Sequence, residues 1–140
     1  MYTVVSKQQF SEKVFKLEIT APLIARSRKA GHFVIVRLGE KGERVPLTIA
    51  GADVEKGTIT LVIQKVGHSS TSICDLGVGD QIADIVGPLG QATHIENFGT
   101  VVCAGGGVGV APMLPIIQAL KAAGNRVISV LAGRSKDLII

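Results

Sequence analysis

The sequence predicts a β-barrel followed by the start of an α/β domain, and three observations lead to this fold class. Short β-compatible runs separated by turn signals fill about the first ninety residues, as in antiparallel barrels and sandwiches. From Asn97 the pattern changes to an apolar strand, a glycine-rich turn and an amphipathic helix, which form one β-α-β unit. The chain has 140 residues, of which 46% are hydrophobic, and this composition excludes a disordered chain.

The predicted barrel strands follow one another with a turn after most of them. The first two are separated by a polar break, and others end at Gly39 and Gly51. The clearest alternation places Ile59, Leu61 and Ile63 on one face of a single strand. The predicted strands cover residues 2–9, 14–20, 33–38, 47–50, 58–66 and 81–86.

A short helix is predicted within this set of strands. Residues 72–76 fit one or two helical turns that end near Gly77. Ser69, Ser70 and Thr71 precede them as candidate N-caps, since hydroxyl side chains accept hydrogen bonds from the free N–H groups of a first turn.

The charge of the chain is mildly basic. Fifteen Lys and Arg stand against 11 Asp and Glu, for a net charge of +4, and no basic run is typical of a nucleic-acid tail. Only 4% of the residues are aromatic, which argues against base stacking, so we expect no nucleic-acid partner. Arg26, Arg28 and Lys29 gather in a predicted loop that Pro22 opens, either as a solvated loop or as a docking patch for an anionic ligand or an acidic partner.

Cysteine content and hydropathy predict a cytoplasmic protein. Two cysteines exclude a disulfide scaffold and a four-cysteine zinc site within the chain, so we expect Cys74 and Cys103 to be reduced core residues. The three histidines lack metal-ligand spacing, and we predict no metal in this chain. No secretory signal opens the sequence. The uncharged residues 97–120 contain glycines and prolines that would break a spanning helix, so no membrane span is expected.

The β-α-β unit is predicted over residues 97–140. Residues 100–104 form a continuous apolar strand, as expected where both faces of a parallel sheet are buried. Residues 111–123 form a helix, and residues 126–132 form the next strand. The helix is indicated by apolar residues at i, i+3, i+4 and i+7, namely Met113, Ile116, Ile117 and Leu120. A nucleotide-binding sheet needs more than two strands, so we expect either a fragment of a longer protein or a second chain that completes the sheet.

The segment most suited to ligand chemistry is the glycine-rich turn at residues 104–112. Glycines there let a pyrophosphate approach the backbone, and the helix that follows offers free N–H groups to phosphates. The spacing lacks the last glycine of a Rossmann turn, and the segment has no P-loop lysine. A plain strand-to-helix connection is the alternative.

Three further segments carry candidate binding residues. Arg44 and Thr48 bracket Pro46 at a strand start, where Arg can grip a phosphate and Thr can bond the polar edge of a ring; the alternative is a surface Arg beside an edge-strand Pro. Residues 66–71 combine a glycine with hydroxyls at a helix start, as an anion site or as plain N-capping. Residues 86–90 mark a sharp turn where a ligand or second domain comes close.

Taken in order, these motifs resemble the ferredoxin–NADP reductase-like flavoprotein superfamily from about residue 4 to residue 140. The series runs Arg-x-Pro-Leu-Thr-Ile, Gly-His-Ser-Ser-Thr, Gly-Asp, Gly-Pro-Leu-Gly and Gly-Gly-Gly-x-Gly-x-Ala-Pro. It is most similar to the alpha subunit of ferredoxin–NADP reductase (sulfide dehydrogenase) and to the dihydroorotate dehydrogenase electron-transfer subunit. The resemblance implies a six-stranded antiparallel FAD-binding barrel over residues 1–96 and the incomplete start of an NAD(P)-binding α/β domain over residues 97–140.

The resemblance also implies a set of cofactor-binding residues. The flavin ring and ribityl chain would meet Pro46, Leu47, Thr48 and Ile49, with Arg44 toward a phosphate. The adenine side of the flavin would lie along Gln64 and Val66, and its pyrophosphate would lie at Gly67, Ser69, Ser70 and Thr71. The floor under the nicotinamide dinucleotide would be Gly105, Gly106, Gly107, Gly109 and Pro112. The sequence departs from the superfamily's Arg-x-aromatic-Ser pattern, because Val45 stands in the Arg place and Leu47 in the aromatic place.

The function implied by the resemblance is FAD-dependent oxidoreduction. A hydride would pass between NAD(P)H and FAD, and electrons would be relayed to or from an iron–sulfur partner, either ferredoxin or a second redox subunit. We predict no catalytic residue, because the cofactors supply the chemistry. A 2Fe–2S cluster is expected only beyond residue 140, so neither cysteine is assigned to it.

Several alternatives stay open at this point. The chain could belong to an electron-transfer subunit of dihydroorotate dehydrogenase or to a reductase component of an oxygenase. It could also be a non-catalytic barrel module that binds a partner. Arg134 and Ser135 could hold the 2′-phosphate of NADP or begin a polar helix. As a fragment, the chain by itself is predicted to be inactive.

Overall fold

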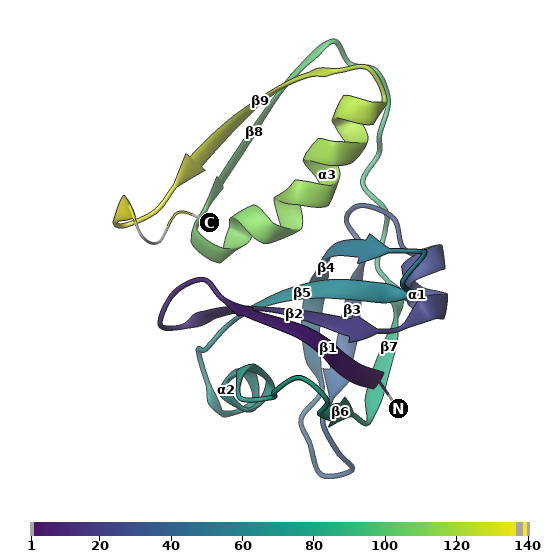
Figure 1. Cartoon of the computed structure of the whole chain (residues 1–140). Coiled ribbons are helices and arrows are strands. Elements are labelled where there is room, and N and C mark those ends of the chain that lie inside the picture. The colour runs from purple at the N-terminus through teal and green to yellow at the C-terminus, as the bar shows by residue number, and fades with distance from the viewer. Residues whose placement is uncertain (1, 137–138, 140) are drawn as a thin grey trace.

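The structure is a computed structural model that describes residues 2–136 and residue 139. It contains a seven-stranded antiparallel sheet and a separate two-stranded parallel sheet. Figure 1 shows the larger sheet curled into a barrel, with the smaller sheet and its helix beyond it. The predicted combination of a β-barrel with one β-α-β unit is confirmed.

The barrel is assembled from neighbouring antiparallel strands in the order β6-β1-β2-β5-β4-β3-β7. The strands are β1 (Tyr2–Gln9), β2 (Val14–Thr20), β3 (Phe33–Arg37), β4 (Val45–Asp53), β5 (Thr58–Gln64), β6 (Gln81–Ile82) and β7 (Asp84–Leu89). The expected number of six is wrong by one, because the last predicted strand is divided at Ala83. Its first part pairs with β1 and its second part with β3. This division nearly closes the sheet, since one continuous segment reaches both edges.

The end of β7 differs from the sequence prediction. Gly87 and Pro88 lie inside the strand rather than in a turn after it, and the chain turns at Gly90, where φ is +85°. A Cβ atom on Gly87 would lie 2.7 Å from Cγ1 of Val34. The glycine is therefore explained by the close approach of β3.

The barrel interior holds the main hydrophobic core. Leu17 pairs with Leu61, and Ile19 pairs with Ile59, across β2 and β5. These four side chains are fully buried, as the alternating pattern of the sequence predicts. Burial of each such side chain contributes about 1.5–3 kcal/mol to the stability of the fold. The pairing of β2 with β5 therefore holds the end of β5, and the residues that follow it, in a fixed position.

Two short helices flank the barrel, and both correct the sequence prediction. Residues 22–27, predicted as a loop, form helix α1 (Pro22–Ser27), which begins on a proline and buries Ile24 and Ala25. Helix α2 (His68–Cys74) begins at His68 rather than at residue 72, with Gly67 as its N-cap. The candidate N-caps Ser69, Ser70 and Thr71 therefore lie inside the helix.

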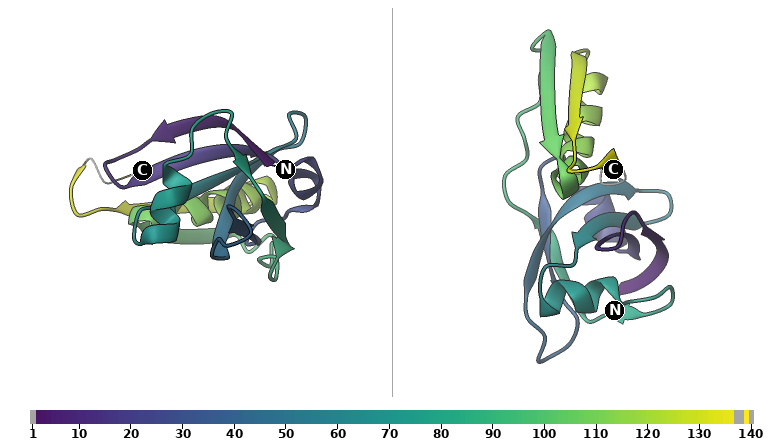
Figure 2. Two further views of the ribbon diagram at one scale, coloured as in Figure 1. Left: turned by 90° about the horizontal axis from the view of Figure 1, so that it is seen from below. Right: turned by 90° about the vertical axis from the view of Figure 1, so that its left-hand side faces the viewer.

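The second part of the chain is a β-α-β unit. Strand β8 (Thr100–Gly106) leads through the 3₁₀ turn η1 (Gly107–Gly109) into helix α3 (Val110–Ala122), and β9 (Arg126–Ala132) pairs in parallel with β8. Figure 2 shows α3 on one face of this sheet. The expectation that β8 is buried on both faces is wrong among the described residues. Cys103, which is buried, alternates with Val102, which is 63% exposed.

The uncharged stretch at residues 97–120 forms β8, η1 and most of α3. Across the part of the chain that the structure describes, no helix has the length and apolar character needed to cross a membrane.

Cys74 in α2 and Cys103 in β8 are both free and buried. Burial raises the pKa of the Cys74 thiol, and the nearby Lys65 only partly opposes this effect.

Candidate functional site

The first half of β4 has an open edge on the side of β5. Residues 45–48 pair with β3, but among the described residues pairing with β5 starts only at Ile49, next to an irregularity in the register. The end of β5 instead continues beside β2, where Gln64 pairs with Val14. Ile49 donates its N–H to the His32 carbonyl oxygen on the side of β3, so Pro46 and Thr48 direct their backbone groups to the opposite side, where no described strand pairs with them. Such an edge offers N–H and C=O groups to a ligand.

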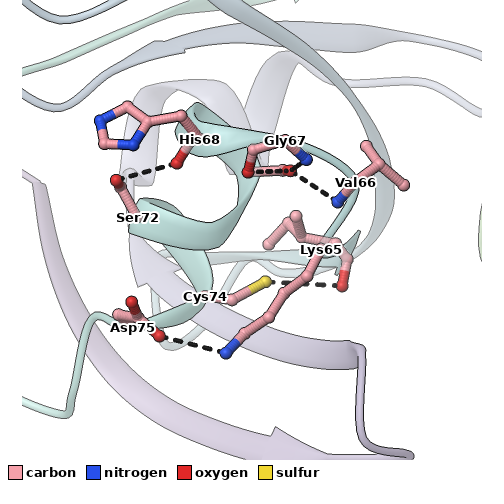
Figure 3. Close-up of polar contacts among 9 residues, drawn as sticks. Lys65, Val66, Gly67, His68, Ser72, Cys74 and Asp75 are labelled. Carbon is pink, nitrogen blue, oxygen red and sulfur yellow. Dashed lines mark hydrogen bonds and ion pairs between the residues drawn. The ribbon is translucent and has the colours of Figure 1, made fainter.

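The loop from β5 to α2 is held by one hydroxyl (Figure 3). Ser70 Oγ accepts hydrogen bonds from the backbone N–H groups of Val66 and Gly67, each at 2.9 Å, and lies 3.2 Å from the Gly67 carbonyl oxygen. The Val66 side chain is 78% exposed, whereas Ser70 is buried. The hydroxyl of Ser70 is thus used inside the protein, and it fixes the path of the loop.

Ser69 connects the start of α2 to the start of β4. Its hydroxyl donates a hydrogen bond to the carboxylate of Glu43. Lys41, Glu43, His68 and Ser69 line a hollow of about 240 Å³ between these two elements. Arg44 is exposed beside Glu43. The structure therefore brings the predicted residues of α2 close to the segment that enters β4.

Lys65 lies on the opposite side of α2 from this hollow. Its Nζ is 3.2 Å from the Asp75 carboxylate and 5.0 Å from the centre of the Phe15 ring. Figure 3 shows this ion pair together with Cys74, whose Sγ is 3.7 Å from the Ile63 carbonyl oxygen. Cys74 is fully buried between α2 and β5, and burial raises the pKa of its thiol, which favours the protonated form of a packing residue.

The glycines of the turn between β8 and α3 are explained by different structural reasons. A Cβ atom on Gly105 would lie 3.0 Å from Cε of Met113, so this glycine allows α3 to pack closely on β8. Gly107 has a φ of +58°, and a Cβ atom there would meet nothing within 4 Å. Gly109 also faces open space, and Pro112 lies in the first turn of α3, where its missing N–H is tolerated.

A cleft of about 970 Å³ lies between the glycine turn and the barrel. Its floor is formed by Gly106, Gly107 and Val108. One wall is formed by residues 10–14 with Gln64, and the other by residues 132–134. The cleft brings together Gly106 and Gly107 of the glycine motif and Gln64, which the family resemblance implies as a cofactor-binding residue.

Other predicted residues lie outside this cleft. A second cavity of about 610 Å³, between α3 and the outer face of β4 and β5, is lined by none of the predicted cofactor-binding residues, although Arg28 of the predicted basic patch borders it. The side chain of Ile49 is buried in the barrel core, so only its backbone can reach a ligand. Pro46 is exposed, while Leu47 and Thr48 are half-buried along the open edge of β4.

Residues 10–13, at the turn between β1 and β2, were missed as part of the site. In the sequence they form only a polar break between two strands. Their place opposite the glycine turn follows from the pairing of Val14 with Gln64, which is a tertiary feature. No local motif could have indicated it.

Comparison with known proteins decides the family. No family model matches the chain. The chain is 44% identical over 137 residues to a Thermotoga maritima protein named as a homolog of the dihydroorotate dehydrogenase B (NAD(+)) electron transfer subunit, covering 98% of this chain and 49% of that protein. The chain belongs to the ferredoxin–NADP reductase-like flavoprotein superfamily.

Solved structures of this superfamily agree with that membership. A chain of an NADH-dependent reduced ferredoxin–NADP oxidoreductase, studied for flavin-based electron bifurcation, has a TM-score of 0.97 at 43% identity, and the match covers 100% of this chain and 51% of that one. Phthalate dioxygenase reductase matches with a TM-score of 0.82 at 20% identity, covering 98% of this chain and 44% of the reductase, and supports the fold alone. The chain thus spans about half the length of the relatives it matches.

Proposed function

We propose that this chain binds FAD and NAD(P)H and forms the flavin-binding part of an electron-transferring oxidoreductase. The observation that carries the proposal is the open edge of β4, because the hydrogen bond from Ser69 to Glu43 joins the start of α2 to the segment that enters this strand. When bound, the flavin would supply hydride transfer with the pyridine nucleotide and one-electron transfer to a second redox subunit or ferredoxin. The domain organisation that we propose places FAD on residues 1–96 and the start of the NAD(P) domain at residues 97–140.

The residues of the open edge fit a flavin. A flavin ring has one polar edge and two apolar faces. The Pro46 carbonyl oxygen and the backbone groups and hydroxyl of Thr48 can bond the polar edge, while Leu47 offers apolar surface in place of the aromatic residue that the superfamily pattern contains. Gln64 ends β5 and Val66 follows it in the exposed loop before α2, and we propose that they contact the adenine side of the flavin.

The start of α2 fits the phosphates of the same cofactor. Ser69 has a half-buried hydroxyl that can turn from Glu43 to a phosphate oxygen. Lys41 lines the same hollow as Ser69, and Arg44 follows Glu43 directly in the chain, so both residues can add positive charge at this place. Ser70 has a different role, because its hydroxyl already holds the backbone of Val66 and Gly67. We propose that Ser70 shapes the loop between β5 and α2, next to Gly67 and Thr71.

The glycine cleft fits a pyridine nucleotide. Its volume of about 970 Å³ is within the range of cofactor pockets. Gly107 and Gly109 leave open space above the backbone. The first N–H groups of α3, beside Pro112, have no partners within the helix and favour negative charge. The residues of the chain then bind and orient both cofactors, and none of them needs to transfer a proton.

The residues of this chain do not fit an iron–sulfur cluster. Such a cluster takes four cysteine ligands, whereas Cys74 and Cys103 are buried in different parts of the chain. Among the described residues, no group of three potential metal ligands is close enough to hold a metal ion. In this proposal the one-electron partner therefore lies outside residues 1–140.

Titration with FAD tests the proposal. We expect the purified chain to bind FAD saturably, with quenching of flavin fluorescence and a shifted visible spectrum. Thr48→Val removes the hydroxyl at the open edge and should weaken binding about fivefold, the size of one lost hydrogen bond. Thr60→Val, on β5 outside the opening, is the matched control and should leave the affinity unchanged. A folded chain that binds no FAD would contradict the proposal.

A further inference from the structure

The turn between β1 and β2 is fixed against the end of β5. The N–H groups of Phe10 and Ser11 donate to the Val14 carbonyl oxygen at 2.9 and 3.3 Å, which closes the turn. The Lys13 carbonyl oxygen accepts a hydrogen bond of 2.7 Å from the N–H group of Lys65. Figures 1 and 2 show the turn projecting toward the end of β9. A rigid piece of the barrel therefore forms one wall of the glycine cleft.

The walls of this cleft carry charged side chains that have no ion-pair partner among the described residues. Glu12 and Lys13 are exposed on the barrel wall, and Arg134 is exposed on the opposite wall. None of the ion pairs found in the described part of the chain involves any of these three residues. The floor between them consists of Gly106, Gly107 and Val108, so a ligand on the floor lies between two cationic side chains.

We propose that Lys13 binds a phosphate group of the pyridine nucleotide, so that the ligand bridges the barrel and the β-α-β unit. This inference rests on the proposed function of the cleft. The glycine floor admits a phosphate close to the backbone, and a lysine ammonium is a mobile point charge that can follow it. Glu12 lines the same wall and opposes the same negative charge. The two neighbouring residues therefore act on affinity with opposite signs.

The experiment is a calorimetric titration of the FAD-loaded chain with NAD⁺ and with NADP⁺. Lys13→Gln should weaken binding of the nucleotide about fivefold, as expected for one exposed charge pair, and the loss should shrink at high salt. Glu12→Gln should strengthen binding about twofold. Lys7→Gln is the matched control on the same hairpin, because the Lys7 Nζ lies 5.0 Å from the centre of the Phe15 ring and outside the cleft.

The outcomes separate this inference from the function on which it rests. If the unaltered chain binds nucleotide but Lys13→Gln behaves like Lys7→Gln, the role of Lys13 is overturned and the proposed function stands. If the unaltered, folded chain binds neither nucleotide, both are overturned. If Lys13→Gln instead weakens FAD binding in a titration of the flavin-free chain, the lysine serves the phosphates of the flavin, and the assignment to the pyridine nucleotide is wrong. Unchanged melting temperatures verify that each variant is folded.

Discussion

The barrel and the β-α-β unit use similar apolar residues but bury them to different degrees. In the barrel, Leu17 and Leu61 are completely buried between strands that have neighbours on both sides. In the smaller sheet, Val102 is 63% exposed and Val130 is 51% exposed. Both lie on the face of the sheet opposite Cys103, which packs beneath α3. Only one face of this sheet is covered among the described residues.

This difference shows where the stability of the chain lies. The barrel encloses its own core, so it can hold the open edge of β4 and the turn before α2 in fixed positions. The described residues of the β-α-β unit contribute nothing to the main hydrophobic cluster, and they are held by the packing of α3 and by polar contacts such as those of Asn125. The proposed ligand site lies at the boundary of the two, which gives bound nucleotide a direct influence on the less stable part.

The largest expected effect is on the free energy of unfolding, when a leucine is replaced by alanine in each of the two regions. Leu61→Ala removes a fully buried side chain of the barrel and should lower the free energy of unfolding by about 3 kcal/mol. Leu131→Ala in β9, where the side chain is 42% exposed, should lower it by about 0.5 kcal/mol. Urea denaturation followed by circular dichroism measures both. Equal losses would contradict the contrast between the regions.

A buried amide is the main polar contact of the second region. Asn125 accepts hydrogen bonds from the N–H groups of Phe98 and Gly99, at 2.7 and 3.1 Å, and donates to the carbonyl oxygens of Glu96 and Leu120, at 2.8 and 2.9 Å. It thereby ties the segment before β8 to the end of α3 and the start of β9.

Removal of this amide should loosen the β-α-β unit alone. Asn125→Ala removes four hydrogen bonds, although the Gly99 N–H and the Leu120 carbonyl oxygen each keep another partner, and it should lower the local opening free energy of α3 and β9 by about 2 kcal/mol. Hydrogen exchange of backbone amides measures the effect region by region. Asn97→Ala is the control, because Asn97 Oδ1 makes one exposed contact with Gly99 N–H. Faster exchange throughout the barrel would show that the two regions are not separable in this way.

The sequence predicted those elements whose pattern is local. Ile59, Leu61 and Ile63 alternate in the sequence and are all buried in β5, and the apolar spacing of α3 placed that helix to within one residue. Helix α1 was missed because six residues that begin with a proline are too few to show a helical period. The extra barrel strand was missed because a break at Ala83 becomes visible only when each half finds a different neighbour.

The candidate site was predictable to a smaller extent. The glycine motif pointed to Gly106 and Gly107, the family resemblance pointed to Gln64, and the structure places these three around one cleft. Glu12 and Lys13 carry no motif, and their position depends on the pairing of β2 with β5. The hydroxyls at α2 could not be ranked from sequence either, because only the structure distinguishes the internal bonds of Ser70 from the bond between Ser69 and Glu43.

A smaller effect is expected at the glycine turn, again within the second region. Gly107 has a φ of +58°, where a side chain is strained, so Gly107→Ala should cost about 1 kcal/mol of local stability. Gly109 has a φ of −63°, and a Cβ atom there meets nothing within 4 Å, so Gly109→Ala should be neutral or slightly stabilising. Thermal unfolding of the two variants without ligand gives the difference. A loss at Gly109 as large as at Gly107 would mean that crowding, rather than backbone conformation, decides the sequence of the turn.

The smallest expected effect concerns the pH dependence of the barrel. Burial raises the pKa of the Cys74 thiol above its ordinary value of 9.0. The unfolded chain therefore loses this proton at a lower pH than the folded chain, so the stability that the neutral thiol contributes is complete below pH 9.0 and is lost as the pH rises through the higher folded value. Cys74→Ala removes the titration, and the stability difference between the natural chain and this variant should shrink between neutral pH and pH values above 9.0. Urea denaturation of both proteins over this range measures the difference, and a difference that stays constant with pH would show that the thiol is not desolvated in the barrel.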